Sequence, residues 1–348
     1  MPFQSPNRIL VTGGAGYIGS HMALRLAESG HSVTIVDNCY RGHSAAVDAV
    51  RAAAPNSAIA FERISVNDTD HLTRIMRDGR IDAVIHFAAL AYVGESVERP
   101  LDYWRTNLGG TLSLLTAMES AGVRRLIFSS TCATYGIPDA AAIPIEESCP
   151  QHPINPYGAA KLAAERAIAD HQNSILRGGG DFAYAALRYF NVIGSDPRGS
   201  IGEDHRPESH LVPSCLLAIL GRRDSLCIMG DDYPTNDGTC VRDFVDVGDL
   251  CEAHLAALHA LTAREALMLN VGTGRGHSVL EVLQACERVC GHAVPAVRGS
   301  RRAGDPPKLV SNPAQIQRIL HWSPAVATLD ESISNAWRWM SAHPNGYG

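Results

Sequence analysis

Short runs of apolar residues alternate with amphipathic stretches over the first 190 residues of the chain. The runs are rich in β-branched residues, which is typical of strands buried on both faces, and they cover residues 8–11, 33–36, 83–86, 125–128 and 182–187. Helical spacing lies between them, with Ile18, Met22 and Leu26 on one face and similar patterns at residues 108–119 and 162–171. The alternation predicts an α/β fold with a doubly wound parallel sheet, whose ligands bind at the carboxyl ends of the strands.

The pattern changes at Asn191, where Gly, Pro and charged residues become frequent as far as Asp237. We therefore expect two domains. The doubly wound domain is predicted to comprise residues 1–190 and 239–262, and a smaller α/β domain to comprise residues 191–238 and 263–348. A chain of 348 residues is long enough for two such domains, at about 150 residues each.

The charge, the apolar runs and the cysteine content of the chain limit its possible partners and its location. The net charge of −6 and the scattered Lys and Arg residues argue against a nucleic-acid partner, and no apolar run is long enough to cross a bilayer. Nine cysteines without a C-x-x-C pair favour reduced thiols and a cytoplasmic protein. A group of acidic residues and histidines at 203–210 lacks the spacing of a helix-borne ligand pair, so we expect a polar loop there and no metal site.

A glycine-rich turn follows the first predicted strand and opens a helix. Gly13, Gly16 and Gly19 lie at the spacing that lets the backbone approach a pyrophosphate, whose charge the helix N-terminus attracts. The second strand ends at Asp37, where a carboxylate would accept hydrogen bonds from an adenosine ribose and repel a 2′-phosphate. The combination predicts a Rossmann-type domain that binds NAD rather than NADP.

A tyrosine and a lysine four residues apart are the main candidates for catalysis. Tyr157 and Lys161 would be neighbours on one face of a helix. A phenol ionises near pH 10, so a phenolate at neutral pH needs about 4 kcal/mol of stabilisation, which the ammonium and a positive nicotinamide would provide. Thr131 lies at the carboxyl end of a predicted strand and is either a proton relay or a capping hydroxyl.

Several motifs along the whole chain resemble the extended short-chain dehydrogenase/reductase superfamily, and within it the UDP-glucose 4-epimerases. The resemblance lies in TGGAGYIG, HFAALAYVGESV, SSTCATYG, YGAAK, RYFNVIGSDP, IGEDHRPESHLVP, DYPTNDGTCVRDFVDV, NVGTGRGHSV and RRAGDPPKLVS. It implies that Tyr157 removes the proton of the sugar 4-hydroxyl, with Lys161 as its electrostatic partner and Thr131 beside the sugar. The 4-keto sugar then turns and takes hydride back on its other face, so NAD is not consumed.

The same resemblance implies the binding residues. The NAD contacts are expected from Gly13, Gly16, Tyr17, Ile18, Gly19, Asp37, Asn38, Phe87, Ala88, Ala89, Asn107, Ser129, Tyr157, Lys161 and Tyr189. The UDP-sugar contacts are expected from Thr131, Tyr157, Asn191, His210, Leu211, Met229, Arg242, Arg302, Asp305 and Leu309. It further implies a homodimer formed through residues 107–120 and 156–172. For Arg242, a structural ion pair with neighbouring residues is the alternative.

The chain departs from the family pattern at a few positions. Ser65 stands where an Asp commonly contacts the adenine, and Ala91 stands where some members have a Lys. Leu309 lies where other members place a Tyr that crowds the sugar, which leaves room for UDP-N-acetylhexosamines. The segment 191–197 is similar to that of UDP-pentose epimerases, so UDP-pentoses are further candidate substrates.

Two other functions compete. Sugar-nucleotide 4,6-dehydratases are similar in sequence but follow the active-site Thr with an Asp-Glu pair, whereas this chain has Cys132 and Ala133. A non-catalytic NAD-sensing protein with the same fold would not need the Tyr157 and Lys161 pair.

Overall fold

The computed structural model describes residues 7–301 and 305–348, and its described residues form two compact units. The first unit contains the residues up to Gly136, Gln151–Arg188 and Cys251–Leu269. The second contains Ile137–Pro150, Tyr189–Leu250 and Asn270–Gly348.

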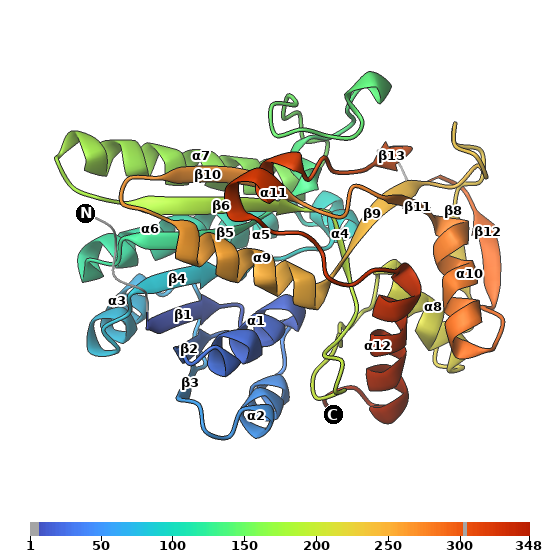
Figure 1. Cartoon of the computed structure of the whole chain (residues 1–348), viewed down its shortest axis with the longest axis horizontal. Helices are drawn as coiled ribbons and strands as arrows, with labels where there is room; N and C mark the ends of the chain where they lie inside the picture. The colour runs from blue at the N-terminus through green and yellow to red at the C-terminus, as the bar shows by residue number, and fades with distance from the viewer. Residues whose placement is uncertain (1–6, 302–304) are drawn as a thin grey trace. The chain divides into compact units, whose positions relative to one another are not determined.

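A seven-stranded sheet is the centre of the first unit (Figure 1). In the order in which they pair, its strands are β10 (Ala266–Val271), β6 (Ala183–Tyr189), β5 (Arg125–Thr131), β4 (Ala83–His86), β1 (Arg8–Thr12), β2 (Ser32–Val36) and β3 (Ile59–Glu62). The pairings of β1 with β2 and β4, of β2 with β3 and of β4 with β5 are parallel. The predicted doubly wound α/β fold and its five strands are confirmed.

Helices connect these strands. They are α1 (Tyr17–Glu28), α2 (Ser44–Ala53), α3 (Thr69–Asp78), α4 (Val93–Glu98), α5 (Pro100–Tyr103), the π-helix η1 (Trp104–Gly109), α6 (Gly110–Ala121), the short η2 (Cys132–Thr134), α7 (Pro156–Arg177) and α9 (Val247–Ala260). Figure 1 shows α1 and α9 in front of the strands, where Arg25 of α1 pairs with Glu252 of α9. Helices α3, α6 and α7 contribute to the core described next.

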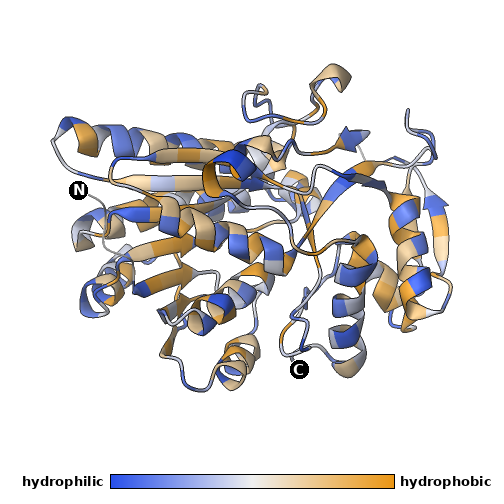
Figure 2. Ribbon diagram, in the orientation of Figure 1, coloured by the Kyte–Doolittle hydropathy of each residue, from blue (hydrophilic) through white to orange (hydrophobic). Residues whose placement is uncertain are grey.

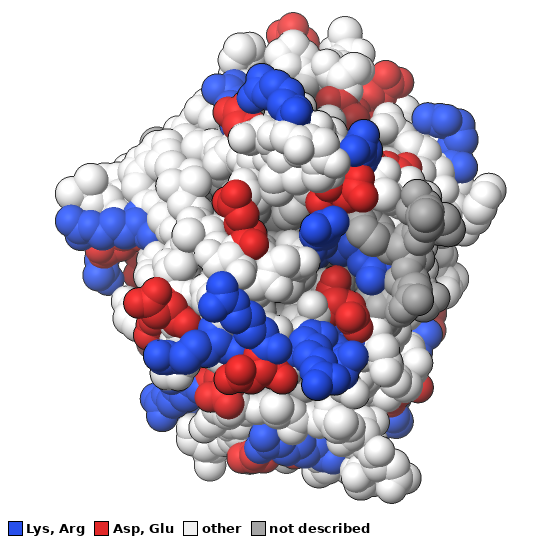
Figure 3. Space-filling view, turned by 90° about the vertical axis from the view of Figure 1, so that its left-hand side faces the viewer, with Lys and Arg blue, Asp and Glu red and all other residues white. Residues whose placement is uncertain are grey.

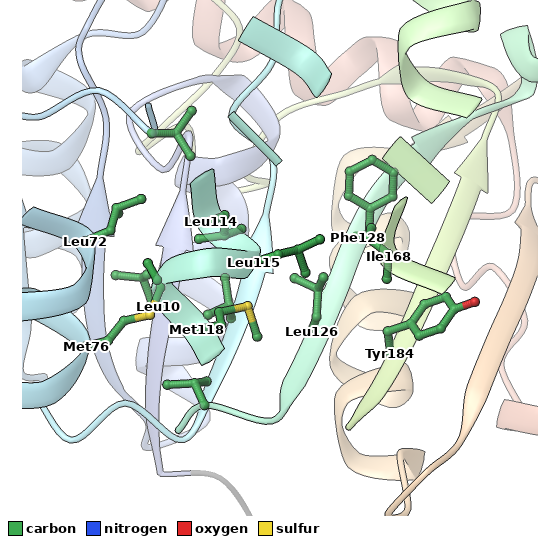
Figure 4. Close-up of a cluster of buried hydrophobic side chains, with 14 of the residues drawn as sticks. Leu10, Leu72, Met76, Leu114, Leu115, Met118, Leu126, Phe128, Ile168 and Tyr184 are labelled. Atoms are coloured by element: carbon green, nitrogen blue, oxygen red, sulfur yellow. The ribbon is translucent and has the colours of Figure 1, made fainter. Parts of the chain in front are cut away.

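The main core of this unit lies between the sheet and helices α3, α6 and α7 (Figure 4). Alternate residues of the buried strands supply one side of it, for example Leu10 of β1 and Leu126 and Phe128 of β5, each fully buried. Leu72 of α3 and Ile168 of α7 lie on the helical side. The central strands are apolar along most of their length (Figure 2), as the sequence pattern predicts for strands covered on both faces.

The second unit contains two small sheets and three packed helices. Strands β11 (Gly276–Ser278), β9 (Val241–Asp246) and β13 (Lys308–Leu309) pair in that order, β7 (Asn191–Ile193) also pairs with β9, and β8 (Leu226–Met229) pairs with β12 (Ala296–Gly299). Helices α8 (Leu211–Ile219), α10 (Val279–Cys290) and α12 (Leu329–Ala342) enclose a second core, and η3 (Ala140–Ala142) and α11 (Ala314–Leu320) complete the unit.

The observed units differ from the predicted domains at residues 137–150. The sequence places this segment in the first domain, but in the structure it belongs to the second unit. The reason is local hydrogen bonding: Ile145 donates to the carbonyl of Val310 at 2.8 Å, and Asn312 donates to the carbonyl of Ile145 at 2.8 Å. The last segment of the first unit also differs from the prediction. It comprises Cys251–Leu269, whereas the sequence predicts residues 239–262.

The surface shows no dominant charge in the view of Figure 3, where acidic and basic side chains lie next to one another. Within the described ranges, no helix is both long and apolar enough to pass through a membrane.

Candidate functional site

The turn after β1 is shaped by glycine. Gly13 has a left-handed backbone, with φ of 71°, and a Cβ there would lie 2.6 Å from the backbone nitrogen of Ala88. A Cβ on Gly19 would lie 2.1 Å from the carbonyl oxygen of Gly13. Helix α1 begins next to this turn at Tyr17 and Ile18, and its N-cap, Gly16, supplies no side-chain cap. The predicted glycine turn is therefore present as a close-packed backbone turn at a helix N-terminus, a setting that attracts anions.

Asp37 follows β2 and is 9% exposed. One carboxylate oxygen accepts from the backbone N–H of Ala15 at 3.1 Å and the other from that of Cys39 at 2.7 Å. Burial raises the pKa of Asp37, although the two backbone donors oppose the shift. These bonds fix the carboxylate beside the glycine turn, and each oxygen keeps a lone pair for a ribose hydroxyl. The neighbouring Asn38 accepts from the N–H of Tyr40 at 3.0 Å.

The segment after β4 is held by the side chain of Asn107. Its amide accepts from the N–H of Leu90 at 2.8 Å and donates to the carbonyl of Leu90 at 2.9 Å. Asn107 is 2% exposed and lies in the π-helix η1. The predicted cofactor residues Phe87, Ala88 and Ala89 belong to the segment that it holds. In this structure Asn107 acts on the protein backbone, which is a positioning role that the sequence did not reveal.

Lys161 reaches the carboxyl end of β5. Its Nζ donates to the carbonyl of Ser129 at 2.8 Å and lies 4.9 Å from the centre of the Phe128 ring. Burial lowers the pKa of Lys161 to about 7, while Glu165 opposes this shift. The pKa of His86 falls to about 3, first because it is buried and second because it faces Lys161. The predicted cofactor residue Ser129 is therefore linked to Lys161.

Tyr157 lies in the first turn of α7, four residues before Lys161. The helix begins there because Pro156 occupies its first turn and the Asn155 side chain accepts from the N–H of Gly158 at 2.8 Å. The Tyr157 ring is 8% exposed and packs edge-on against Tyr103, with centroids 6.4 Å apart. The predicted arrangement of Tyr157 and Lys161 on one helix is confirmed.

Thr131 ends β5 in the same unit. Its hydroxyl accepts from the N–H of Ala133 at 3.1 Å and caps η2, so the capping interpretation holds. A hydroxyl that accepts one bond retains its own O–H as a donor, so capping leaves the predicted proton relay open.

A buried ion pair behind this site was missed from the sequence. Glu165 of α7 and Arg188 of β6 pair at 2.7 Å, with side chains 5% and 4% exposed. Ser130 donates to Glu165, and Arg188 donates to the Tyr135 hydroxyl at 3.0 Å. Glu165 lies four residues after Lys161, so helical spacing could have indicated its place. Its partner Arg188 lies 23 residues further along the chain and gives no local signal.

Three of the predicted substrate residues lie on one sheet of the second unit. Arg242 of β9 is next to Leu309 of β13 in the strand register, and Asn191 of β7 pairs with Phe244 of β9. Arg242 donates to the carbonyl of Val241 at 2.8 Å and to Asp305 at 2.6 Å. Arg242 is thus ion-paired, but with another predicted substrate residue and not with its neighbour Asp243. Arg302 lies outside the described residues.

The remaining predicted residues are distributed as follows. His210 is the N-cap of α8 and Leu211 its first residue, Met229 ends β8 and is 37% exposed, and Tyr189 ends β6. The His210 imidazole lies 2.9 Å from both Glu203 and Glu208. Burial opposes a charge on this ring, but the two carboxylates outweigh burial and raise the pKa of His210 to about 10.

Comparison with known proteins agrees with this geometry. The model of the NAD dependent epimerase/dehydratase family matches residues 9–272. The UDP-glucose 4-epimerase of Halalkalibacterium halodurans is 45% identical over 97% of this chain and 97% of its own length.

Two solved structures are similar along nearly the whole chain. The Stenotrophomonas maltophila UDP-glucose 4-epimerase, with bound NAD and formylated UDP-arabinopyranose, has a TM-score of 0.91 at 38% identity and covers 97% of this chain and 98% of its own. The UDP-Glc/GlcNAc 4-epimerase of Campylobacter jejuni has a TM-score of 0.81 at 36% identity and covers 97% and 99%. With a family match across the glycine turn, Tyr157 and Arg242, this chain belongs to the NAD dependent epimerase/dehydratase family.

Proposed function

We propose that the chain is an NAD-dependent UDP-glucose 4-epimerase, which interconverts UDP-glucose and UDP-galactose through a 4-keto sugar. The observation that carries the proposal is the placement of Tyr157 and Lys161 one helical turn apart, with the lysine at the carboxyl end of β5. The near full-length similarity to a UDP-glucose 4-epimerase supports it. Bound NAD supplies the hydride acceptor, and then the hydride donor, at sugar C4.

The residues of the first unit fit this cofactor. The glycine turn is packed closely at the start of α1, where a pyrophosphate would meet the helix N-terminus. Asp37 offers two fixed acceptor oxygens to the adenosine ribose. Ser65 carries no carboxylate toward the adenine, so the ribose and pyrophosphate contacts would contribute most of the binding of this half of the cofactor.

In the proposed reaction Tyr157 accepts the proton of the sugar 4-hydroxyl and returns it after the sugar has turned. In its protonated form Lys161 lowers the energy of the phenolate through its charge, and the Thr131 hydroxyl donates to the sugar oxygen. A single residue acts as base and then as acid, because the same proton leaves and returns. Because the hydride removed from C4 would also be returned to C4, the net reaction needs no added oxidant.

We assign the nucleotide part of the substrate to residues of the second unit. Arg242 uses two of its nitrogens on Val241 and Asp305, and a guanidinium has five N–H donors, so donors remain for a phosphate. Asp305 is the proposed acceptor for the uridine ribose, and Asn191 and His210 are further polar contacts. Arg302 is proposed for the diphosphate from the sequence alone.

The sugar range is proposed to extend beyond the hexoses. Leu309 is 8% exposed in β13, and an aliphatic side chain there takes less room than the Tyr of other family members. The similar structures include an epimerase of UDP-Glc and UDP-GlcNAc and one bound to a UDP-arabinopyranose derivative. We therefore propose that UDP-N-acetylglucosamine and UDP-pentoses are also substrates.

Leu309→Tyr tests this pocket. We expect the variant to lose turnover of UDP-N-acetylglucosamine by about tenfold or more, since one misfit group in a pocket is worth about 1–3 kcal/mol. Turnover of UDP-galactose should change little. Measured kcat/KM values for both sugars in both proteins decide the point, and equal losses for the two sugars would contradict a pocket role for Leu309.

A dehydratase is the second candidate, but no observation favours it. Cys132 and Ala133 follow Thr131 in η2, and neither side chain can act as the carboxylic acid or base that elimination of water requires. A protein that only senses NAD would have no use for the paired Tyr157 and Lys161 or for Arg242.

A homodimer fits the surface of the first unit. Exposed apolar side chains lie on neighbouring helices of α4 to α6: Val97 at 64%, Leu101 at 63%, Trp104 at 37% and Leu112 at 46% exposure. A group of this kind is typical of a contact surface. We infer that a second copy covers it through α6 and α7, the helices that the family resemblance implies. We also infer a cytoplasmic location, because all nine cysteines are free thiols.

The direct test is an incubation of the purified protein with UDP-galactose and no added NAD, followed by separation of the products. The proposal predicts UDP-glucose at equilibrium with UDP-galactose and no net reduction of cofactor. A 4-keto-6-deoxy sugar nucleotide would identify a dehydratase instead, and an unchanged substrate with NAD bound would favour a sensing protein.

A further inference from the structure

A loop in the second unit brings two carboxylates and two imidazoles together. Glu203, His205, Glu208 and His210 each offer one ligand atom, and these atoms all lie within 4.8 Å of one another. Glu203 and Glu208 are 7% and 9% exposed. The sequence predicts only a polar loop here, because the four residues lack the spacing of a ligand pair on a helix. The loop instead brings together residues that are two, three and two positions apart, a spacing that differs from that of a helix.

The distances between these atoms are close to those of a four-coordinate metal site. A tetrahedral ion with bonds of 2.0–2.1 Å separates its ligand atoms by about 3.3 Å. His205 Nδ1 lies 3.0 Å from Glu203 Oε1 and 3.6 Å from Glu208 Oε2. His210 Nδ1 lies 2.9 Å from Glu203 Oε1 and from Glu208 Oε1. These four separations lie within a few tenths of an ångström of the tetrahedral value, and all the ligand atoms lie within 4.8 Å of one another.

Other contacts hold the loop in this shape. The N–H of His210 donates to Glu208 Oε1 at 2.7 Å, and Arg223 donates to the Glu208 carbonyl at 2.6 Å. On the other side, Asp204 accepts from the N–H of Tyr347 at 2.9 Å. These bonds gather the four side chains, so an ion would not have to order them.

We propose that Glu203, His205, Glu208 and His210 form a binding site for a divalent transition metal ion, with Zn²⁺ as the best match. Two imidazole nitrogens and two carboxylate oxygens in a four-coordinate arrangement suit zinc better than Mg²⁺ or Ca²⁺, which prefer six or more oxygens. The two carboxylates balance the charge of the ion. Each imidazolium gives its Nδ1 proton to the solvent as its bond to the metal forms.

The competing interpretation is a cluster of ion pairs that never binds metal. Both arrangements use the same atoms, so the test must measure the metal itself. The purified full-length protein, with whatever NAD it retains, would be stripped with a chelator, dialysed against buffer with Zn²⁺, passed over a desalting column and analysed for zinc by mass spectrometry. We expect about one zinc ion per chain.

Two variants and a control make the measurement specific. His205→Ala and Glu203→Gln each remove one ligand but leave His210, a proposed substrate contact, in place. Both should weaken zinc binding by at least about tenfold. His31→Ala is the matched control, because His31 and His259 also lie close together, with ring centroids 5.8 Å apart, but are not part of the cluster. It should bind zinc as the wild type does.

Cobalt gives a second readout that needs no variant. Co²⁺ in a tetrahedral site absorbs visible light much more strongly than hydrated Co²⁺, so the wild type should develop this band with one equivalent of the ion. Zinc that is absent from the wild type, or that is equally bound by His205→Ala and Glu203→Gln, overturns the proposal. Since no substrate is present, the result is independent of whether the chain is an epimerase.

Discussion

Lys161 is a buried lysine, and its surroundings disfavour the charged form of its side chain. Its Nζ has one carbonyl acceptor and an aromatic ring as neighbours, so burial destabilises the ammonium and lowers its pKa to about 7. The position of Lys161 one turn after Tyr157 could be predicted from the sequence, because helical spacing fixes it. The pKa could not be predicted, because it depends on Ser129 and Phe128, which a different strand supplies.

The lowered pKa predicts a pH-dependent difference in stability between the wild type and Lys161→Met. Between pH 7 and about 10 the unfolded wild type binds a proton at this lysine and the folded protein does not, so the stability of the wild type relative to the variant rises with pH. The slope is at most about 1.4 kcal/mol per pH unit. Below pH 7 both states are protonated and the difference is constant.

Urea unfolding of both proteins at several pH values measures this difference. Lys308→Met is the matched control, because it makes the same substitution at an exposed lysine. A Lys161→Met difference that is independent of pH would mean that Lys161 keeps an ordinary pKa in the folded chain.

At the scale of elements, helix α7 is tied to strand β6 behind the catalytic pair. Glu165 and Arg188 form this tie, and both are almost completely buried. Sequence patterns predicted α7 and β6 correctly because each has a regular period. The ion pair between them is buried and joins residues that are 23 positions apart in the sequence. No periodic pattern of apolar residues indicates such a pair.

Glu165→Gln should destabilise the fold by about 3–5 kcal/mol, because it leaves the Arg188 guanidinium buried without a counter-charge. Asp181→Asn is the control. Asp181 pairs with Arg264 at 2.7 Å, but the two side chains are 40% and 52% exposed, so this change should destabilise the fold much less than Glu165→Gln. Denaturant unfolding compares the two variants. Similar losses in the free energy of unfolding would show that the buried ion pair stabilises the fold no more than the exposed one.

At the scale of the whole molecule, the alternation of strands and helices was sufficient to predict the doubly wound unit, and the edge strand β3 was missed. Residues 59–62 alternate between half-buried and exposed, so they lack the continuous apolar run of the central strands. The second unit was predicted only in outline. Its sheets are built from strands of 2–6 residues that meet from distant parts of the chain, so local patterns are too short to identify them.

The proposed homodimer makes a prediction at the same scale. Leu112→Glu places a charge in the exposed apolar group on α4 to α6 and should shift the protein from dimer to monomer in sedimentation velocity experiments. Val297→Glu is the control, because Val297 is 53% exposed on β12, in the other unit. A wild type that sediments as a monomer, or a Leu112→Glu variant that dimerises as tightly as Val297→Glu, would contradict this surface.

The central claim is that the Tyr157 hydroxyl carries the proton of the reaction, and Tyr157→Phe tests it most directly. Turnover of UDP-galactose and NAD content per chain would be measured for this variant and for Tyr103→Phe, which removes another buried hydroxyl, bonded to Glu95 at 2.9 Å. We predict that Tyr157→Phe loses about 100-fold or more in kcat and retains its NAD, while Tyr103→Phe remains active. Full turnover by Tyr157→Phe would contradict the proposed mechanism.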